Sequence, residues 1–306
     1  MKQLSITWDV PDSTGYLFSL AKSLACAVKN SPWAEVAEDI VATSGFAFRM
    51  WVSADLCPSA TSIWDFDGQQ AWVESGGLTC SYVGRAWGED AIEQARQLEA
   101  ITTVKASIDA GVPAVSWDIG VPEWGLITGY DDQSQVLFVQ PVNDNAPVEM
   151  AYALLGKRDI PILSVLTVTG KTDKSPEMIL KDTMALAVSH LRGEEWCDNA
   201  KGLEAYPKLI DIFKENPELA SGWNAEYFLG TYGALKWYAW KYFEKAGQVE
   251  LTEIYRRVYD AWMEAFALKT GPDAGQAEVR EKIATLLAQA HAAEMQAVAV
   301  MAALLG

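Results

Sequence analysis

The spacing of hydrophobic residues predicts helices in the first part of the chain. Residues 15–28 are apolar on nearly all sides of a helix, and the preceding Asp-Ser-Thr at 12–14 are residue types that cap helix N-termini. We therefore expect a buried helix that begins directly after residue 14. Residues 89–110 place apolar side chains three or four positions apart, which predicts a second helix. Residues 43–53 alternate in part and predict an extended segment.

Short runs of β-branched and aromatic residues follow, as is typical of strands. They lie at residues 113–117, 124–130, 136–139 and 160–169. Asp-Asp-Gln-Ser at 131–134 separates the second run from the third and predicts a hairpin turn. Strands joined by a hairpin pair antiparallel, so we expect an antiparallel sheet in this region of the chain.

The pattern changes again after Gly170. Residues 176–305 have helical periodicity that proline and glycine interrupt at intervals. Strands and helices that are segregated along the sequence are typical of α+β proteins. We predict an α+β chain with one domain at residues 1–170, which contains the sheet, and an all-helical domain at residues 171–306.

The composition narrows the classes of function. The net charge is −17, from 24 basic and 41 acidic side chains, and no basic run is present, which argues against binding to nucleic acid or to an anionic membrane surface. No apolar stretch reaches the roughly 18 residues of a membrane span, and the residues after Met1 lack the apolar core of a signal peptide. We expect a cytoplasmic protein whose ligand is neutral or cationic.

Cysteine and histidine are too sparse and too scattered for a metal centre. The cysteines form no C-x-x-C pair, and both histidines follow residue 170. Zinc sites of the usual kind need such residues clustered at short spacing, so we expect no metal, and no cofactor motif is evident. The residues are Cys26, Cys57, Cys80, Cys197, His190 and His291.

One strand carries a resemblance to a known family. Residues 123–132 are Glu-Trp-Gly-Leu-Ile-Thr-Gly-Tyr-Asp-Asp. This stretch resembles the His-aromatic-Val-Val-x-x-Gly-Tyr-Asp strand of the bacteriocin-processing cysteine peptidases, which have the papain-like fold. The layout of the whole chain, with Ser44–Arg49 and Gly202–Tyr206, is similar to the butirosin-biosynthesis H-type family. The resemblance implies a papain-like domain followed by a helical one, in a family whose prototype transfers an acyl group from a carrier protein to an aminoglycoside.

The chain departs from this family where the chemistry takes place. A papain-like enzyme needs a cysteine at the N-terminus of the buried helix, whereas residues 12–15 here are Asp-Ser-Thr-Gly. The position of the family histidine is occupied by Glu123, and the third position falls near Gln140. We therefore expect no conventional Cys–His peptidase activity. The chain would be a pseudoenzyme that binds a small molecule or peptide in the former active-site cleft.

Glu123 is the leading candidate for a functional side chain. A carboxyl group among Trp117, Trp124 and Tyr130 would be desolvated, and its pKa would rise toward the range of a general acid or base. Cys57, a loop thiol beside several hydroxyls, is the other catalytic candidate. A structural role remains open for both: Glu123 would then pair with Arg49 or cap a backbone group, and Cys57 would be a buried or bystander thiol. The candidate ligand-binding residues are Ser13, Thr14, Arg49, Trp51, Ser59, Asp118, Trp124 and Tyr130.

Three functions remain open from the sequence. The first is a pocket protein in which Glu123 and nearby tryptophans hold a cationic or polar group. The second is an acyltransferase or amide hydrolase, by analogy with the family, with Glu123 as general base. The third is an assembly subunit, such as a homodimer, whose interface is the helical domain.

Overall fold

The computed structural model describes residues 1–62, 64–142 and 144–306. The strands are β1 (Lys2–Gln3), β2 (Trp51–Val52), β3 (Leu78–Arg85), β4 (Ala114–Ser116), β5 (Gly125–Asp131), β6 (Val136–Pro141), β7 (Val148–Ala151), β8 (Leu163–Lys171) and β9 (Ala200–Lys201). The α-helices are α1 (Ser19–Lys29), α2 (Ile40–Thr43), α3 (Gly68–Ser75), α4 (Glu93–Asp109), α5 (Pro176–Leu191), α6 (Ala205–Glu215), α7 (Pro217–Ser221), α8 (Trp223–Lys245), α9 (Val249–Thr270) and α10 (Ala277–Leu305).

The chain folds into two compact units, each made of several segments. Unit 1 comprises Met1–Pro11, Ser19–Ile40 and Phe66–Lys174, and unit 2 comprises Asp12–Phe18, Val41–Asp65 and Ser175–Gly306. The sequence pattern placed one boundary at residue 170, where the character of the chain changes from strands to helices. The segments 12–18 and 41–65 precede that boundary and nevertheless belong to the unit that contains the C-terminal helices.

Unit 1 is built on an antiparallel sheet. Its strand order is β3-β8-β4-β5-β6-β7, and β1 pairs with β5. The strand patterns near residues 113–117, 124–130, 136–139 and 160–169 correspond to β4, β5, β6 and β8. The predicted α+β class, with an antiparallel sheet and a helical C-terminal region, is therefore confirmed. Strands β3 and β7, which lie at the two ends of the strand order, were not predicted from the sequence.

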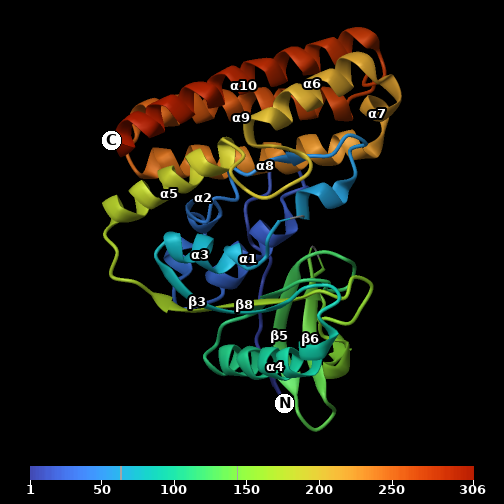
Figure 1. Cartoon of the computed structure of the whole chain (residues 1–306), viewed down its shortest axis with the longest axis vertical. Coiled ribbons are helices and arrows are strands. Elements are labelled where there is room, and N and C mark those ends of the chain that lie inside the picture. The colour runs from blue at the N-terminus through green and yellow to red at the C-terminus, as the bar shows by residue number, and fades with distance from the viewer. Residues whose placement is uncertain (63, 143) are drawn as a thin grey trace. The chain divides into compact units, whose positions relative to one another are not determined.

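One face of the sheet is covered by α4, which lies beside β5 in Figure 1. Ala100, Val104 and Ile108 of α4 are fully buried in the same apolar cluster as Ile127 and Val165 of the sheet. These helix positions recur every four residues, so they lie along one face of α4. The helix predicted for residues 89–110 is confirmed, and its first turn is a 3-10 turn at Asp90–Ile92.

The buried first helix starts later than the sequence indicated. It begins at Ser19, and every residue from Ser19 to Val28 is buried. Residues 12–18 form a loop instead, because Asp12 Oδ1 accepts hydrogen bonds from the N–H groups of Gly15 (2.9 Å) and Leu17 (3.2 Å). Gly15 also has φ of +80°, a left-handed conformation that interrupts a helix. A side chain that was expected to cap a helix therefore organises a turn.

The extended segment predicted at 43–53 was largely wrong. Only Trp51 and Val52 form a strand, β2, which pairs with β9 in a two-stranded sheet of unit 2. The preceding residues continue from α2 into a turn around Gly45, whose φ is +80°. The aromatic residues at 46 and 48 are fully buried without belonging to a strand.

The helices of unit 2 enclose a buried ion pair. Figure 1 shows α6, α8, α9 and α10 packed side by side. Lys236 of α8 and Glu294 of α10 are both fully buried, with 2.8 Å between Nζ and Oε1. Tyr206 of α6 donates a hydrogen bond of 2.8 Å to the other carboxylate oxygen, and Trp262 of α9 donates to the Tyr206 hydroxyl at 2.9 Å. Polar contacts thus join four helices through one carboxylate.

We predict that removing one partner of this ion pair destabilises the protein strongly, and that removing both charges destabilises it less. Lys236→Met should lower the free energy of unfolding by about 3–5 kcal/mol, because the Glu294 charge would stay buried without its cation. The double variant Lys236→Met/Glu294→Gln should be more stable than the single one, since the isolated charge is gone. Urea denaturation measures both.

The matched control is the half-exposed pair Lys282–Glu264, also in unit 2, with 2.7 Å between Nζ and Oε1. Lys282→Met should cost less than about 1 kcal/mol. Equal losses for the two lysines would contradict the assigned role of burial.

Candidate functional site

The central feature of unit 1 is a hydrogen bond between Ser19 and Glu123. Ser19 is the first residue of α1, is 6% exposed, and donates from Oγ to the Glu123 carboxylate. The N–H of Trp124 donates to the same Oγ at 3.3 Å. A hydroxyl and a carboxylate thus meet at the N-terminus of the buried helix.

Sequence reasoning selected Glu123 but missed Ser19. The helix was expected to begin after residue 14, so Ser13 and Thr14 were assigned to its N-terminus. The signal that could have found Ser19 was Gly15, because glycine interrupts helices. A helix that starts after Gly15 has Ser19 as the first serine or threonine of the buried run.

A clamped loop between β4 and β5 positions Glu123. The N–H of Ile119 donates to the Glu123 carbonyl at 3.0 Å, which closes the loop. Arg158 donates to the carbonyls of Asp118 and Gly120, each at 2.9 Å. With these contacts, the loop holds the Glu123 side chain toward α1.

Asp118 serves this loop rather than the Ser19 hydroxyl. Asp118 is 3% exposed and has a φ of +58°. Its Oδ2 accepts a hydrogen bond of 3.3 Å from the N–H of Ile160. Burial raises the pKa of its carboxyl, while the Ile160 N–H and the Arg158 charge oppose the rise. The structure therefore gives Asp118 partners of its own, on the segment that leads into β8.

Burial raises the pKa of Glu123 above its ordinary value of 4.5, and the hydrogen bond from Ser19 offsets some of that rise. The neighbouring Trp124 is fully buried, and its ring lies 5.4 Å from that of Trp117 and 5.2 Å from that of Phe66. The positive end of the α1 dipole acts in the opposite direction to burial and favours the anion.

Several buried polar atoms in this region have no hydrogen-bond partner among the described residues. They include the indole nitrogen of Trp117 and the amide oxygen of Gln69. Both residues lie next to Ser164. The side-chain amide nitrogen of Gln69 donates to the Ser164 hydroxyl at 2.7 Å, and the backbone N–H of Trp117 donates to the Ser164 carbonyl at 3.0 Å. A buried donor and a buried acceptor without partners are the kind of groups that a polar ligand or water satisfies.

Arg49 belongs to unit 2, where it binds a different carboxylate. Its Nε donates to Glu195 at 2.9 Å and its Nη1 to the Thr61 carbonyl at 3.0 Å. The guanidinium carbon lies 3.8 Å from the ring centroid of Trp51. His190 Nδ1 also contacts the Glu195 carboxylate. Burial alone would raise the pKa of Glu195, but the charges of Arg49 and His190 hold it below its usual value.

The hydroxyls and the thiol proposed for the site also lie in unit 2. Thr14 Oγ1 donates to the Gly230 carbonyl at 2.9 Å, and Ser13 is exposed. Ser59 is exposed on the 3-10 helix Pro58–Ser62, and Cys57 just before it is partly buried. These residues belong to unit 2, whereas Glu123 belongs to unit 1.

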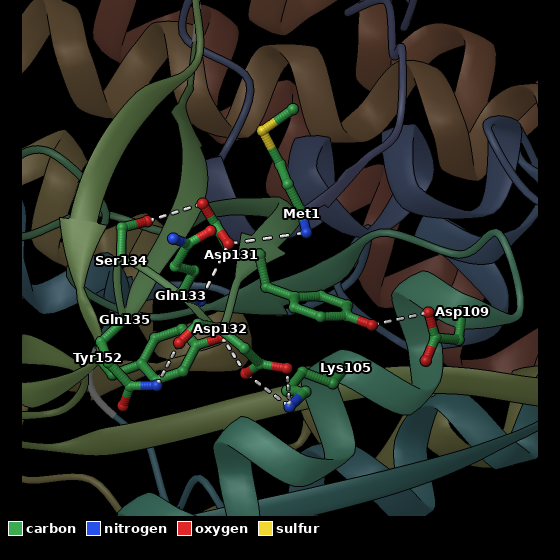
Figure 2. A network of polar contacts seen from close by, with 10 residues as sticks. Met1, Lys105, Asp109, Asp131, Asp132, Gln133, Ser134, Gln135 and Tyr152 are labelled. Atoms are coloured by element: carbon green, nitrogen blue, oxygen red, sulfur yellow. Dashed lines mark hydrogen bonds and ion pairs between the residues drawn. The ribbon is translucent and has the colours of Figure 1, made fainter.

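Tyr130 lies at the opposite end of β5 from Glu123. A strand of that length spans roughly 20 Å. The Tyr130 hydroxyl donates to Asp109 Oδ1 at 2.9 Å. Figure 2 shows Asp109 together with the neighbouring contact between Lys105 and Asp132. In the same network Lys105 bridges to Asp132 at 2.6 Å. The structure thus does not bring Tyr130 to Glu123, because strand length separates the two ends of one motif.

Comparison with models of known protein families finds no match, and a search of curated proteins finds no significant relative. Among the described residues of the chain, no helix is long and apolar enough to cross a membrane. Over residues 1–62, 64–142 and 144–306, no group of three or more His, Cys, Asp or Glu side chains is arranged to hold a metal ion.

We predict that Glu123 makes stability depend on pH. Because its folded-state pKa is raised, the wild-type chain should lose stability as the pH rises from the ordinary carboxyl range through that pKa. Glu123→Gln should remove this loss, so the variant should be the more stable protein at pH 8 and should match the wild type near pH 4. Urea midpoints at both values measure this. Exposed Glu149, replaced in the same way, is the control and should leave the pH profile unchanged.

Arg49 gives a second prediction. Arg49→Lys should destabilise the protein by about 2 kcal/mol or more, since a single ammonium group cannot reproduce the two directed hydrogen bonds and the stacking on Trp51. Chemical denaturation of Arg256→Lys, at a residue whose side chain is 67% exposed, provides the comparison and should show a change below about 0.5 kcal/mol. Similar losses at both positions would refute the assignment.

Proposed function

We propose that this protein has a papain-like fold in its sheet-containing region, followed by a helical region as in the butirosin-biosynthesis H-type family. We further propose that it binds a small molecule or peptide where papain-like peptidases carry their Cys–His pair. The observation that carries the proposal is the contact between Ser19, at the start of the buried helix, and Glu123, just before β5. In this proposal, a serine and a glutamate take the places of the nucleophile and the base.

The chemistry of the site favours a ligand with a cationic or polar group. The Glu123 carboxylate accepts the hydrogen bond from the hydroxyl, and the next residue in the chain, Trp124, packs its ring against those of Trp117 and Phe66. Aromatic faces and a carboxylate together bind ammonium and guanidinium groups. The net charge of −17 attracts cations from solution and repels polyanions. We propose a cytoplasmic setting, where such ligands include amines and basic peptides.

The test uses agmatine and tetramethylammonium as cationic probes and N-butylacetamide as a neutral one. Calorimetry and tryptophan fluorescence at pH 8 should show that the cations bind and that Glu123→Gln weakens them about tenfold or more. Glu149→Gln is the matched control, since it removes the same charge from an exposed strand position of unit 1. Equal affinity in the wild type and Glu123→Gln, or preference for the neutral probe, would refute the proposal.

A further inference from the structure

The hydrogen-bond pattern fixes where the Ser19 proton points. The Trp124 N–H is a donor only, so the Ser19 oxygen must accept from it. An ionised carboxylate is an acceptor only, so the Ser19 O–H must donate to Glu123. The hydroxyl proton therefore lies between Ser19 Oγ and the Glu123 carboxylate. A nucleophile and a base within hydrogen-bond reach are the minimal arrangement for nucleophilic catalysis.

The start of α1 adds donors for a developing negative charge. The first N–H groups of any α-helix have no intrahelical partner, and they carry the positive end of the helix dipole. Ser19 is the first residue of α1, so an oxyanion formed on a carbonyl attached to its Oγ would lie beside this end. Donors held in place before the reaction stabilise such an oxyanion.

We infer that Ser19 is an acyl-accepting nucleophile and Glu123 its general base, acting on carboxylic esters. The inference rests on the proposed function, because it uses the same site. Ser19 Oγ attacks the ester carbonyl while Glu123 takes the hydroxyl proton. The tetrahedral intermediate then expels the alcohol, which receives that proton from Glu123. Water or an acceptor alcohol attacks the acyl-serine ester, Glu123 takes its proton, and that proton returns to Ser19 as the acyl product leaves.

The strength of the base selects esters over peptide bonds. A carboxylate is a weaker base than the imidazole of a Cys–His pair, so it activates the serine less. The carbonyl of an ester is more electrophilic than that of an amide and needs less activation. Burial of Glu123 raises its pKa, which makes the carboxylate a better base than an exposed one. The acidic surface favours neutral or cationic esters.

The experiment measures hydrolysis of p-nitrophenyl acetate and covalent labelling by a fluorophosphonate, with the labelled residue located by mass spectrometry. The wild type should hydrolyse the ester and carry the label on Ser19. Ser19→Ala should lose the label and at least about 100-fold of the rate, and Glu123→Gln should lose about 100-fold or more. The wild-type rate should rise with pH through the raised pKa of Glu123. Ser134→Ala, at an exposed serine of unit 1, should keep full rate and label.

Further variants keep the outcomes distinct. Ser19→Ala should still bind agmatine, because it retains the carboxylate, so loss of ester chemistry alone separates catalysis from binding. If Ser19→Ala does not fold, Ser19→Cys replaces it, and iodoacetamide should alkylate the introduced thiol in the native protein. A label elsewhere, or an unchanged rate in Ser19→Ala, overturns the nucleophile. Unchanged agmatine affinity in Glu123→Gln overturns the proposed function, whatever the esterase result.

Discussion

A carboxylate that leaves water must find hydrogen-bond donors or a cation, and three carboxylates of this protein meet that constraint differently. Glu294 has Lys236 and the Tyr206 hydroxyl, and Glu195 has Arg49 and His190. Within the described residues, the contacts of the Glu123 carboxylate are with the hydroxyl of Ser19 instead of a cation. Its charge is therefore compensated less, which is why its pKa rises while that of Glu195 falls.

This difference separates the two carboxylates that are paired with cations from Glu123, for which we propose a reactive role. A carboxylate held by a cation is fixed in its ionised form and serves packing. A carboxylate held by a hydroxyl can accept the proton of that hydroxyl, and burial brings its affinity for protons closer to what general base catalysis requires. The structural environment of Glu123 thus supports both the binding of a cation and the activation of Ser19.

Much of unit 1 followed from the sequence. The strands β4, β5, β6 and β8 were found because each is a short run of apolar or β-branched residues next to turn residues, and α4 because its apolar side chains recur on one face. The strands β3 and β7 at the two edges of the sheet were missed. Only some residues of β3 are buried, and most residues of β7 are exposed, so neither strand has a strong apolar pattern. The start of α1 was placed too early because Asp12 has the same side chain whether it caps a helix or closes a turn.

Local patterns in the sequence were sufficient for the α+β class and the helical C-terminal region, because spacing and residue type are properties of short stretches of chain. Glu123 was selected through the resemblance of residues 123–132 to a family strand. The partner of Glu123 depended on the tertiary fold. Ser19 and Glu123 are 104 positions apart, and they meet because α1 packs on β4 and β5 while Arg158 holds the loop that carries the carboxylate. A hydrogen bond between such distant residues depends on how the elements pack, and no local pattern encodes that partner.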